Sequence, residues 1–478
     1  MNTRTGTTRR LALLVAGVVA IAACGGSDDA ATDGTDDAPT TEVDSTITTD
    51  AADAPAATGA DDGADAATTE AIDDATDEDT PGTDAPAATE PVEDGGAADG
   101  GTTDFRTLEP PTGEPIVIGM VNTEGTPGLD FPEMRTDTDL AVAYLNEHGG
   151  FGGRPIEVVH CTAAGSPETS QSCAQEMSGE GVELVMLGLD LFPGYDTYAA
   201  SDIPVFGALP ILPGDYTADA LFHTGGNATT MAGMAGFAVE QFGAATVGII
   251  SADNPGANGS EASLTAALDK AGVSYVSIKG GDNETDAGFQ GLMREATKDD
   301  PDVLVSLYDD AGCVGAIRAR VSLALDIPTV STPICGSAEV IDVVGDDALG
   351  WYFVGAGASD GSASAQTLDE IIEPEYGDDA SGSLGLGALG IGQVMGLANV
   401  ANALAAEGAE VTGSAMYERL ATSDDLVNFP NESPYACNTS AAYPAVCNFA
   451  FPVGAYAEGG ELITVPGFDS FSVVDYLP

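Results

Sequence analysis

The sequence contains few basic residues. Its 478 residues include 13 Lys and Arg against 77 Asp and Glu, which gives a formal net charge of −64 at pH 7. An excess of negative charge of this size repels phosphate groups, so it argues against nucleic acids and anionic lipid surfaces as partners. The charge does not identify a ligand, because acidic surfaces are common among exported proteins.

Residues that usually hold metals or perform catalysis are also scarce. The three histidines, His148, His160 and His223, are isolated from one another, and no two cysteines form a C-x-x-C pair. Neither an H-E-x-x-H zinc motif nor a P-loop is present. We therefore expect no metal site, no cofactor and no catalytic residues, with each histidine on the surface or packed in the core.

One glycine pattern is similar to a nucleotide-binding motif. Residues 385–390 match G-x-G-x-x-G, which binds a dinucleotide only when a strand precedes it and a helix follows. The preceding residues 377–383 are rich in Gly, Asp and Ser and are typical of a loop. The pattern instead opens a long helix of small residues that extends to Ala405, so we interpret its glycines as sites of close helix packing.

Long apolar runs are confined to the start of the chain. Arg4, Arg9 and Arg10 precede an apolar run at 11–20, which is too short for a transmembrane helix and typical of a secretory signal. Ala22-Ala23-Cys24 resembles the lipobox of bacterial lipoproteins, which implies a signal peptide at 1–23, lipid on Cys24 and a protein anchored on the extracytoplasmic face of the membrane. An ordinary cleaved signal is the alternative, and Arg9-Arg10 leaves the Tat route open beside Sec.

The segment that follows Cys24 has the composition of a disordered linker. Residues 24–112 include 25 Asp and Glu but a single aromatic residue, Phe105, and a single basic one, Arg106. Such a segment cannot bury enough apolar surface to offset its ordering entropy, and its like charges repel. We expect an acidic linker at 24–112 and a folded domain at 113–478.

The six remaining cysteines favour disulfides, because their number is even and the protein is exported. Six cysteines allow fifteen pairings, and buried thiols are the alternative. Proximity in sequence favours Cys161–Cys173, Cys313–Cys335 and Cys437–Cys447.

The folded part alternates between strand and helix patterns, which predicts βαβ units and parallel sheets in two α/β lobes. Short apolar runs predict strands at 116–121, 156–159, 184–187, 204–207, 246–250, 275–278, 303–307 and 329–331. Helical spacing predicts helices at 135–147, 168–177, 195–200, 231–242, 261–271, 289–297 and 314–324.

The stretch from Asn146 to Val159, which reads NEHGGFGGRPIEVV, carries a specific resemblance. With the strand at 116–119 before it and GAATVGII at 243–250 after it, the chain is similar to branched-chain amino-acid-type substrate-binding proteins of ABC transporters. That resemblance implies a type I periplasmic-binding-protein fold with two Rossmann-like lobes, three crossings and hinge closure around a small molecule. It implies lobe I at about 115–227 and 358–445, and lobe II at about 228–357 and 446–478. It also implies a transporter permease as partner, and we expect a monomer.

Candidate ligand residues follow from a general rule, since ligands of open parallel sheets lie beyond the carboxyl ends of the strands. Helix N-termini at that edge also offer backbone N–H groups to an anion. The residues that follow the predicted strands are Asn122, Glu124, Asp190, Phe192, Tyr195, Asp253, Asn254, Tyr308, Asp309, Ser337 and Glu339.

The amino-acid pocket of the family is poorly preserved in this sequence. Leucine-binding members have hydroxyl side chains after the third and fourth strands to hold the α-carboxylate, whereas this chain has Asp190 and an apolar stretch at 206–210. An aromatic residue of the second lobe is replaced by Asp253-Asn254-Pro255. Tyr308 and Glu339 lie near a tyrosine and an ammonium-binding acid of the family. We therefore hypothesise a ligand without a carboxylate, such as an amide, a cation or an aromatic compound.

Together these features predict a lipid-anchored solute-binding protein that delivers a small molecule to an ABC importer. A ligand-sensing lipoprotein with the same fold is the alternative, and a secreted α/β enzyme is a further one. A permease and ATPase encoded beside the protein would favour transport, whereas a neighbouring sensor kinase would favour sensing.

Overall fold

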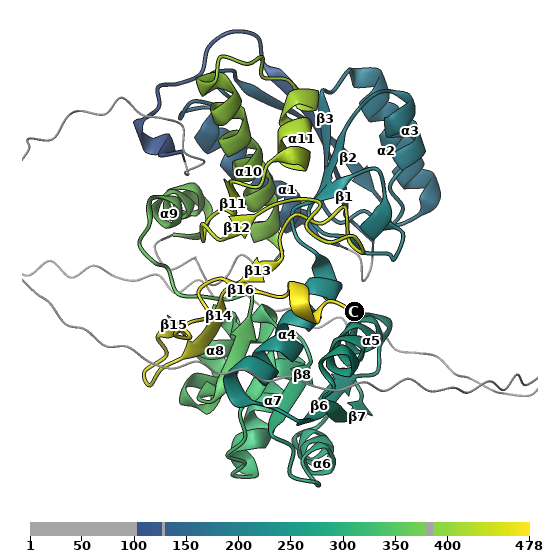
Figure 1. Ribbon diagram of the computed structural model, residues 1–478, viewed down its shortest axis with the longest axis vertical. Helices are drawn as coiled ribbons and strands as arrows, with labels where there is room; N and C mark the ends of the chain where they lie inside the picture. The colour runs from purple at the N-terminus through teal and green to yellow at the C-terminus, as the bar shows by residue number, and fades with distance from the viewer. Residues whose placement is uncertain (1–102, 127–129, 378–385) are drawn as a thin grey trace, which may run out of the picture. The chain divides into compact units, whose positions relative to one another are not determined.

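The computed structural model describes residues 103–126, 130–377 and 386–478, in which two β-sheets organise two lobes (Figure 1). The first sheet is parallel throughout, in the order β2-β1-β3-β4-β5. Its strands are β1 Ile116–Thr123, β2 Ile156–Ala163, β3 Leu184–Leu187, β4 Val205–Gly207 and β5 Leu221–Phe222. With these strands lobe I contains α1 Pro132–Leu145, α2 Pro167–Glu180, α3 Tyr195–Ala200, α9 Ala363–Tyr376, α10 Gly387–Ala406 and α11 Gly413–Thr422.

Strand β1 shows why helices cover both faces of this sheet. Side chains alternate along a strand, so a strand buried on both faces is apolar throughout. Ile116, Ile118 and Met120 join the core that includes α1 and α10. Val121 joins the separate core with α2 and α3.

The second sheet has the order β15-β14-β10-β9-β8-β6-β7 and is parallel except at β14 and β15. Its strands are β6 Thr246–Ala252, β7 Ser274–Gly280, β8 Val303–Leu307, β9 Thr329–Ser331, β10 Trp351–Val354, β14 Val453–Tyr456 and β15 Leu462–Thr464. Lobe II also contains α4 Gly226–Phe242, α5 Pro255–Ala271, α6 Asp286–Ala296, α7 Asp310–Ser322 and α8 Ala338–Val344. Val247 and Ile249 face the core with α4 and α5, whereas Ile250 faces the core with α6 and α7.

Local sequence signals explain where several helices begin and end. Ser166 and Thr169 form a capping box at the start of α2, with Pro167 in the first turn. Gly181 and Gly243 end α2 and α4 in the left-handed conformation, with φ of 71° and 64°. That conformation costs glycine less than any other residue.

The stretch that carries the family resemblance is a structural turn. Gly149, Gly150, Gly152 and Gly153 all have positive φ, between 58° and 89°, so they carry the chain from α1 to β2 as predicted. The Asn146 side chain donates to the Ile156 carbonyl at 2.9 Å and accepts from the Ile156 N–H at 2.8 Å, which fixes the start of β2.

Helix α10 packs closely on α1 and confirms the interpretation of its glycines. A Cβ on Gly390 would lie 2.6 Å from the carbonyl oxygen of Met134 in α1, so only glycine allows this approach. Of the helices in the described ranges, α10 alone is long and apolar enough to cross a membrane. However, 61% of its apolar window is buried, which is typical of a core helix.

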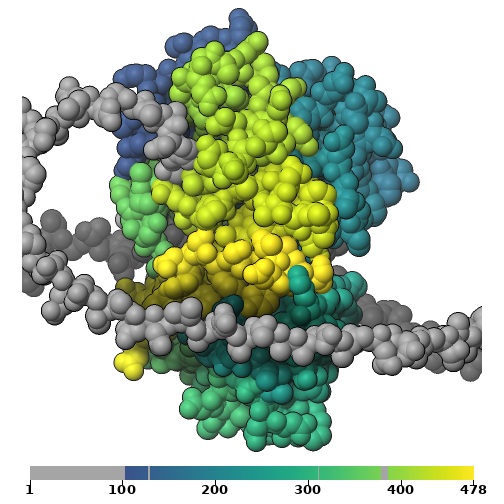
Figure 2. Space-filling model, in the orientation of Figure 1, coloured from purple at the N-terminus to yellow at the C-terminus, as the bar shows by residue number. Residues whose placement is uncertain are grey.

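The chain passes between the lobes three times, after β5, after β10 and after Cys447. The third passage contacts the other two, since Cys447 N–H donates to the Phe222 carbonyl at 3.0 Å and Gly355 N–H to the Pro452 carbonyl at 2.9 Å. Two short antiparallel pairs lie in the C-terminal part of the chain: β11 Leu426–Val427 with β12 Pro434–Tyr435, and β13 Ala450–Phe451 with β16 Phe471–Ser472. In Figure 2 these C-terminal segments cover the boundary between the lobes on the face shown.

Three disulfides join the pairs that sequence proximity favours: Cys161–Cys173, Cys313–Cys335 and Cys437–Cys447. The first links β2 to α2, the second links α7 to the turn before α8, and the third links the last passage to the residues after β12. Cys24 and the predicted linker up to residue 102 lie outside the described residues.

Candidate functional site

The carboxyl ends of both sheets lie where the chain changes lobe. Strand β5 ends at Phe222 and leads into α4 of lobe II, while β10 ends at Val354 and leads into α9 of lobe I. Because the strands β1 to β5 share one direction, all their carboxyl ends lie at the edge from which the chain departs for lobe II. The loops at these two edges form the candidate ligand face.

Asn122, near the end of β1, and Glu124, directly after it, hold this edge of lobe I together. Asn122 is only 1% exposed; its amide nitrogen donates to the Phe131 carbonyl at 2.7 Å, and its oxygen accepts from Leu189 N–H at 3.0 Å. Glu124 forms an ion pair with Arg135 at 3.0 Å. Asn122 therefore joins the loop after β1 to the loop after β3, and the charge of Glu124 is compensated.

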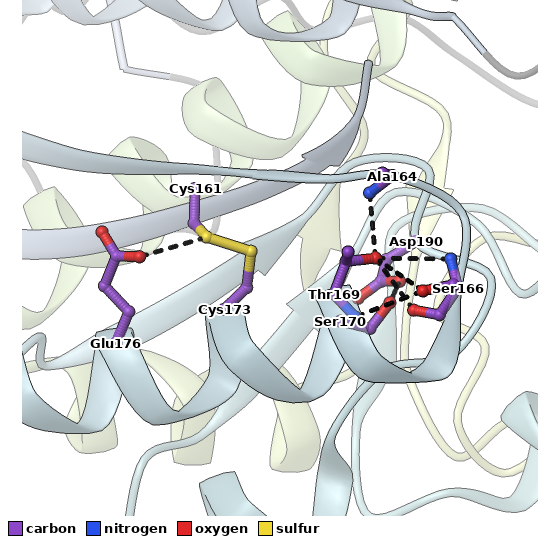
Figure 3. Close-up of a disulfide and its surroundings, with 8 residues drawn as sticks. All are labelled: Cys161, Ala164, Ser166, Thr169, Ser170, Cys173, Glu176 and Asp190. Atoms are coloured by element: carbon purple, nitrogen blue, oxygen red, sulfur yellow. Dashed lines mark hydrogen bonds between the residues drawn. A yellow bond between two sulfur atoms is a disulfide. The ribbon is translucent and has the colours of Figure 1, made fainter. Parts of the chain in front are cut away.

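Asp190 is buried against Ser170 of α2 in lobe I (Figure 3). The residue is 3% exposed, and its Oδ1 accepts from Ser170 Oγ at 2.5 Å and from Phe192 N–H at 3.2 Å. Burial raises the pKa of Asp190, which favours the protonated form. Its buried position therefore does not support the use of Asp190 as evidence against a carboxylate ligand.

Tyr195 is linked to the loop after β4 through Asp215. Its hydroxyl donates to Asp215 Oδ1 at 2.9 Å, and Asp215 Oδ2 accepts from Ile211 N–H and Leu212 N–H at 2.9 and 2.8 Å. Burial and the nearby Asp215 raise the pKa of Tyr195, so the hydroxyl stays protonated. Tyr195 thus helps to shape the loop after β4 from beneath.

Phe192 is the candidate in lobe I that is plainly open to solvent, with 40% exposure. Leu212, in the loop after β4, is exposed to the same extent, and sequence reasoning missed it. In the sequence, Leu212 is an apolar residue in a proline-rich loop after a strand. Such a residue is easily mistaken for part of the hydrophobic core.

In lobe II, Asp253 is exposed and Asn254 caps α5 by accepting from Ala257 N–H at 2.8 Å. Ser337 caps α8 in the same way, accepting from Val340 N–H at 3.4 Å. The N-termini of these two helices are therefore partly satisfied by their own side chains, so they offer an anion less than the sequence predicts.

Tyr308, Asp309 and Glu339 complete the predicted set. Tyr308 is 3% exposed and packs edge-to-face on Phe289, and burial raises its pKa to about 12. Its hydroxyl has no hydrogen-bond partner in the described part of the chain. Asp309 is exposed at the N-cap of α7, and Glu339 is exposed in the first turn of α8.

Gln393 is a further residue of this edge that sequence reasoning missed. It is fully buried in α10, and its amide nitrogen donates to the carbonyls of Leu187 and Phe206 at 3.1 and 2.9 Å. Leu187 is the last residue of β3 and Phe206 the last but one of β4, so Gln393 anchors the two strand ends to α10. In the sequence, a single glutamine within an apolar helix was the feature that could have indicated this role.

A separate cavity lies in lobe I beside α10, and none of the predicted ligand residues lines it. Its lining includes His223, Asn399, Arg419 and Tyr435. The cavity has a volume of about 40 Å³, which is room for about three water molecules. We place the candidate site at the strand ends rather than here, because this cavity lies between α10 and the β11–β12 pair.

One hydrolase-like pattern also escaped the sequence reasoning, since residues 357–361 match G-x-S-x-G. Ser359 lies in an exposed loop, and the three histidines are engaged elsewhere. His148 stacks on Tyr144, His160 pairs with Asp139, and His223 is buried against Tyr435. None of the three histidines is therefore placed to act as the base for Ser359.

Residues 115–435, about two thirds of the chain, match the family described as periplasmic binding protein. The chain belongs to the periplasmic binding protein family. This family is extracytoplasmic and consists of substrate-binding proteins rather than enzymes. No curated protein gives a significant match to the sequence.

Solved structures agree with this membership. An ABC transporter substrate-binding protein from Sphaerobacter thermophilus is 18% identical, with a TM-score of 0.61 over 76% of this chain and 100% of its own. The branched-chain amino acid transporter substrate-binding protein from Streptococcus pneumoniae, solved with isoleucine, is 17% identical, with a TM-score of 0.53 over 74% and 99%. A solute-binding protein from Rhodopseudomonas palustris, solved with 3,4-dihydroxybenzoic acid, is 15% identical, with a TM-score of 0.55 over 75% and 98%. At these identities the likeness establishes the fold of periplasmic binding proteins, not the ligand.

Proposed function

We propose that this periplasmic binding protein is lipid-anchored and delivers a small solute to an ABC importer. The observation that carries the proposal is the family match over 115–435, in a chain whose two largely parallel sheets turn their carboxyl ends toward the three passages. The proposed organisation is a signal peptide at 1–23, an acidic linker at 24–112 and the two-lobed domain at 113–478. The permease of the importer is the proposed partner.

The ligand face consists of the loops that follow β1, β3 and β4 in lobe I and β6, β8 and β9 in lobe II. Phe192, Asp253, Asp309 and Glu339 are exposed there and are proposed to contact the solute. The buried or capping residues of the predicted set are proposed to position these loops: Asn122, Glu124, Asp190, Tyr195, Asn254, Tyr308 and Ser337.

Solute capture is tested with the full-length protein, purified in detergent, by a thermal-shift screen against amino acids, amides, amines, polyamines, sugars and aromatic acids. A ligand that binds only the folded state stabilises it by about 2.7 kcal/mol at a hundredfold excess over Kd. A rise in Tm that increases with ligand concentration supports capture. Delivery is then tested by uptake of that solute in cells with and without the protein, and capture without dependent uptake would contradict transport.

Anchoring is tested by labelling cells with an alkyne fatty acid. The wild-type protein is expected to carry the label and to sediment with membranes. Cys24→Ala is expected to lose both properties, because the proposed anchor is attached to that sulfur. Equal labelling of the two proteins would disprove the anchor while leaving solute capture untouched.

A further inference from the structure

Two large apolar side chains stand exposed at the ends of neighbouring strands in lobe I. Phe192 follows β3 and Leu212 follows β4, and each is 40% exposed. The two strands pair in parallel, with Val185 opposite Val205 and Leu187 opposite Gly207, so their loops emerge side by side at the same edge. Both side chains therefore offer apolar surface at this edge to a bound molecule.

The backbone N–H of each of these apolar residues donates a hydrogen bond to a buried carboxyl group. Asp190, 3% exposed, accepts from Phe192 N–H, and Asp215, 5% exposed, accepts from Leu212 N–H. Asp190 is fixed in turn by Ser170 of α2, as Figure 3 shows, and Asp215 by Tyr195 of α3. The loops are preorganised, and the backbone N–H groups of Phe192 and Leu212 already donate to an internal carboxyl group.

The loops of the same face carry no basic side chains in their sequences. The sequences between the strands and the following helices contain no Lys or Arg at 124–131, 188–194, 208–214, 253–254, 281–285 or 332–337. Two cations flank these loops and both are paired, Lys279 with Glu261 at 2.9 Å and Arg135 with Glu124 at 3.0 Å. Asp253 and Asp282 are exposed at the lobe II edge. A carboxylate would meet uncompensated negative charge here, whereas a cation would be attracted.

From these observations we infer that the solute is an apolar amine, with an alkyl or aromatic group packed on Phe192 and Leu212 and an ammonium group turned toward the lobe II loops. It carries no carboxylate. The inference rests on the proposed function, because it assumes that the strand-end face captures a solute.

The test compares three compounds of one shape by isothermal titration with the full-length protein in detergent: phenethylamine, phenylalanine and phenylacetate. Phenethylamine is expected to bind at least about tenfold more tightly than phenylalanine, and phenylacetate more weakly still. Binding of phenylalanine or phenylacetate as tight as that of the amine overturns the inference, but it leaves the proposed function intact because a solute is still captured.

Absence of phenethylamine binding also overturns the inference, and the broader solute screen then decides the proposed function separately. If the screen identifies another solute, the function stands and the amine assignment fails. If nothing in the screen binds, both fail.

Variants locate the bound amine. Phe192→Ala is expected to weaken phenethylamine binding by about tenfold. The matched control is Tyr275→Ala, which removes an aromatic residue of similar exposure, 39%, from the opposite end of β7, and its affinity should stay unchanged. Equal losses in both variants would place the amine elsewhere.

Asp190 is a positioning residue, and its conservative variant separates positioning from mere stability. Asp190→Asn keeps an oxygen that accepts from Ser170 Oγ and Phe192 N–H, so amine affinity should be retained. Asp190→Ala releases the loop and is expected to lower the affinity by about tenfold in protein that remains folded by circular dichroism. Equal affinity of the alanine variant and the wild type would show that Asp190 does not position Phe192.

Discussion

His223 makes stability depend on pH at the scale of a single residue. It is 4% exposed, its Nδ1 lies 3.3 Å from the Tyr435 hydroxyl, and burial lowers its pKa from 6.5 to about 4. Between these pH values the unfolded chain binds a proton that the folded chain does not. The free energy of unfolding should therefore fall as pH drops from 6.5 to 4, by up to about 3 kcal/mol from this residue.

The measurement is urea unfolding at several pH values for the wild type and His223→Asn. The variant removes the titrating group, so its stability should fall less steeply over the same window. Carboxyl groups titrate in both proteins, and their contribution cancels in the difference. Parallel curves for the two proteins would show that His223 is not the group responsible.

Individual residues also show how far a sequence can predict a site. The strand-end rule selected Asn122, Asp190 and Tyr195, which lie at or after the carboxyl ends of β1 and β3. It could not reveal that their polar groups serve the scaffold, because the partners are distant along the chain. Asn122 binds Leu189, 67 positions away, and such a contact exists only after the sheet has formed. Exposure of Phe192 and Leu212 likewise depends on which neighbours pack over them.

At the scale of elements, the contact between α1 and α10 predicts opposite effects for two glycines of one helix. Gly390→Ala places a methyl group against the Met134 carbonyl oxygen and should destabilise the protein by about 1–3 kcal/mol. Nothing lies within 4 Å of a Cβ on Gly396, so Gly396→Ala should stabilise by about 0.5–1 kcal/mol through helix propensity. Urea unfolding of both variants checks the sign, and destabilisation by both would contradict this packing.

The helices and strands that were predicted well from the sequence are those whose apolar residues follow one clear periodicity. Strand β3 at Leu184–Leu187 and helix α3 at Tyr195–Ala200 match the predicted 184–187 and 195–200. Helix α4 begins at Gly226 instead of 231, because its first turn is rich in Gly and Thr and lacks an apolar stripe. Strand β10 and helices α8, α9 and α11 were not predicted; α9 even contains Pro374, which normally argues against a helix.

At the scale of the whole molecule, the two-lobed fold was predictable because the order of elements and one specific motif agreed. The antiparallel strands β14 and β15 were not, because they come from the far C-terminus and join the sheet beside β10. Pairing over such a sequence separation leaves no local pattern. Identification of the ligand fails for a related reason, since the scaffold motif around Asn146 carries no ligand chemistry.

The charge of the folded domain yields the last prediction, which concerns salt. Residues 113–478 contain 52 Asp and Glu against nine Lys and Arg. Repulsion within a compact domain opposes folding, and salt screens it, with a Debye length of about 30 Å at 0.01 M and about 3 Å at 1 M. Raising potassium chloride should therefore increase the midpoint of urea unfolding steeply at low concentration and level off above roughly 0.3 M as screening saturates.

Potassium sulfate at matched ionic strength separates screening from exclusion of salt from the surface. Sulfate also strengthens apolar burial, so it should continue to stabilise after chloride has reached its plateau. A midpoint that is independent of chloride would show that the carboxylates are spaced too widely to repel one another. A linear rise without a plateau would assign the effect to burial instead of charge. A plateau in chloride identifies self-repulsion, which the scarcity of Lys and Arg leaves uncompensated.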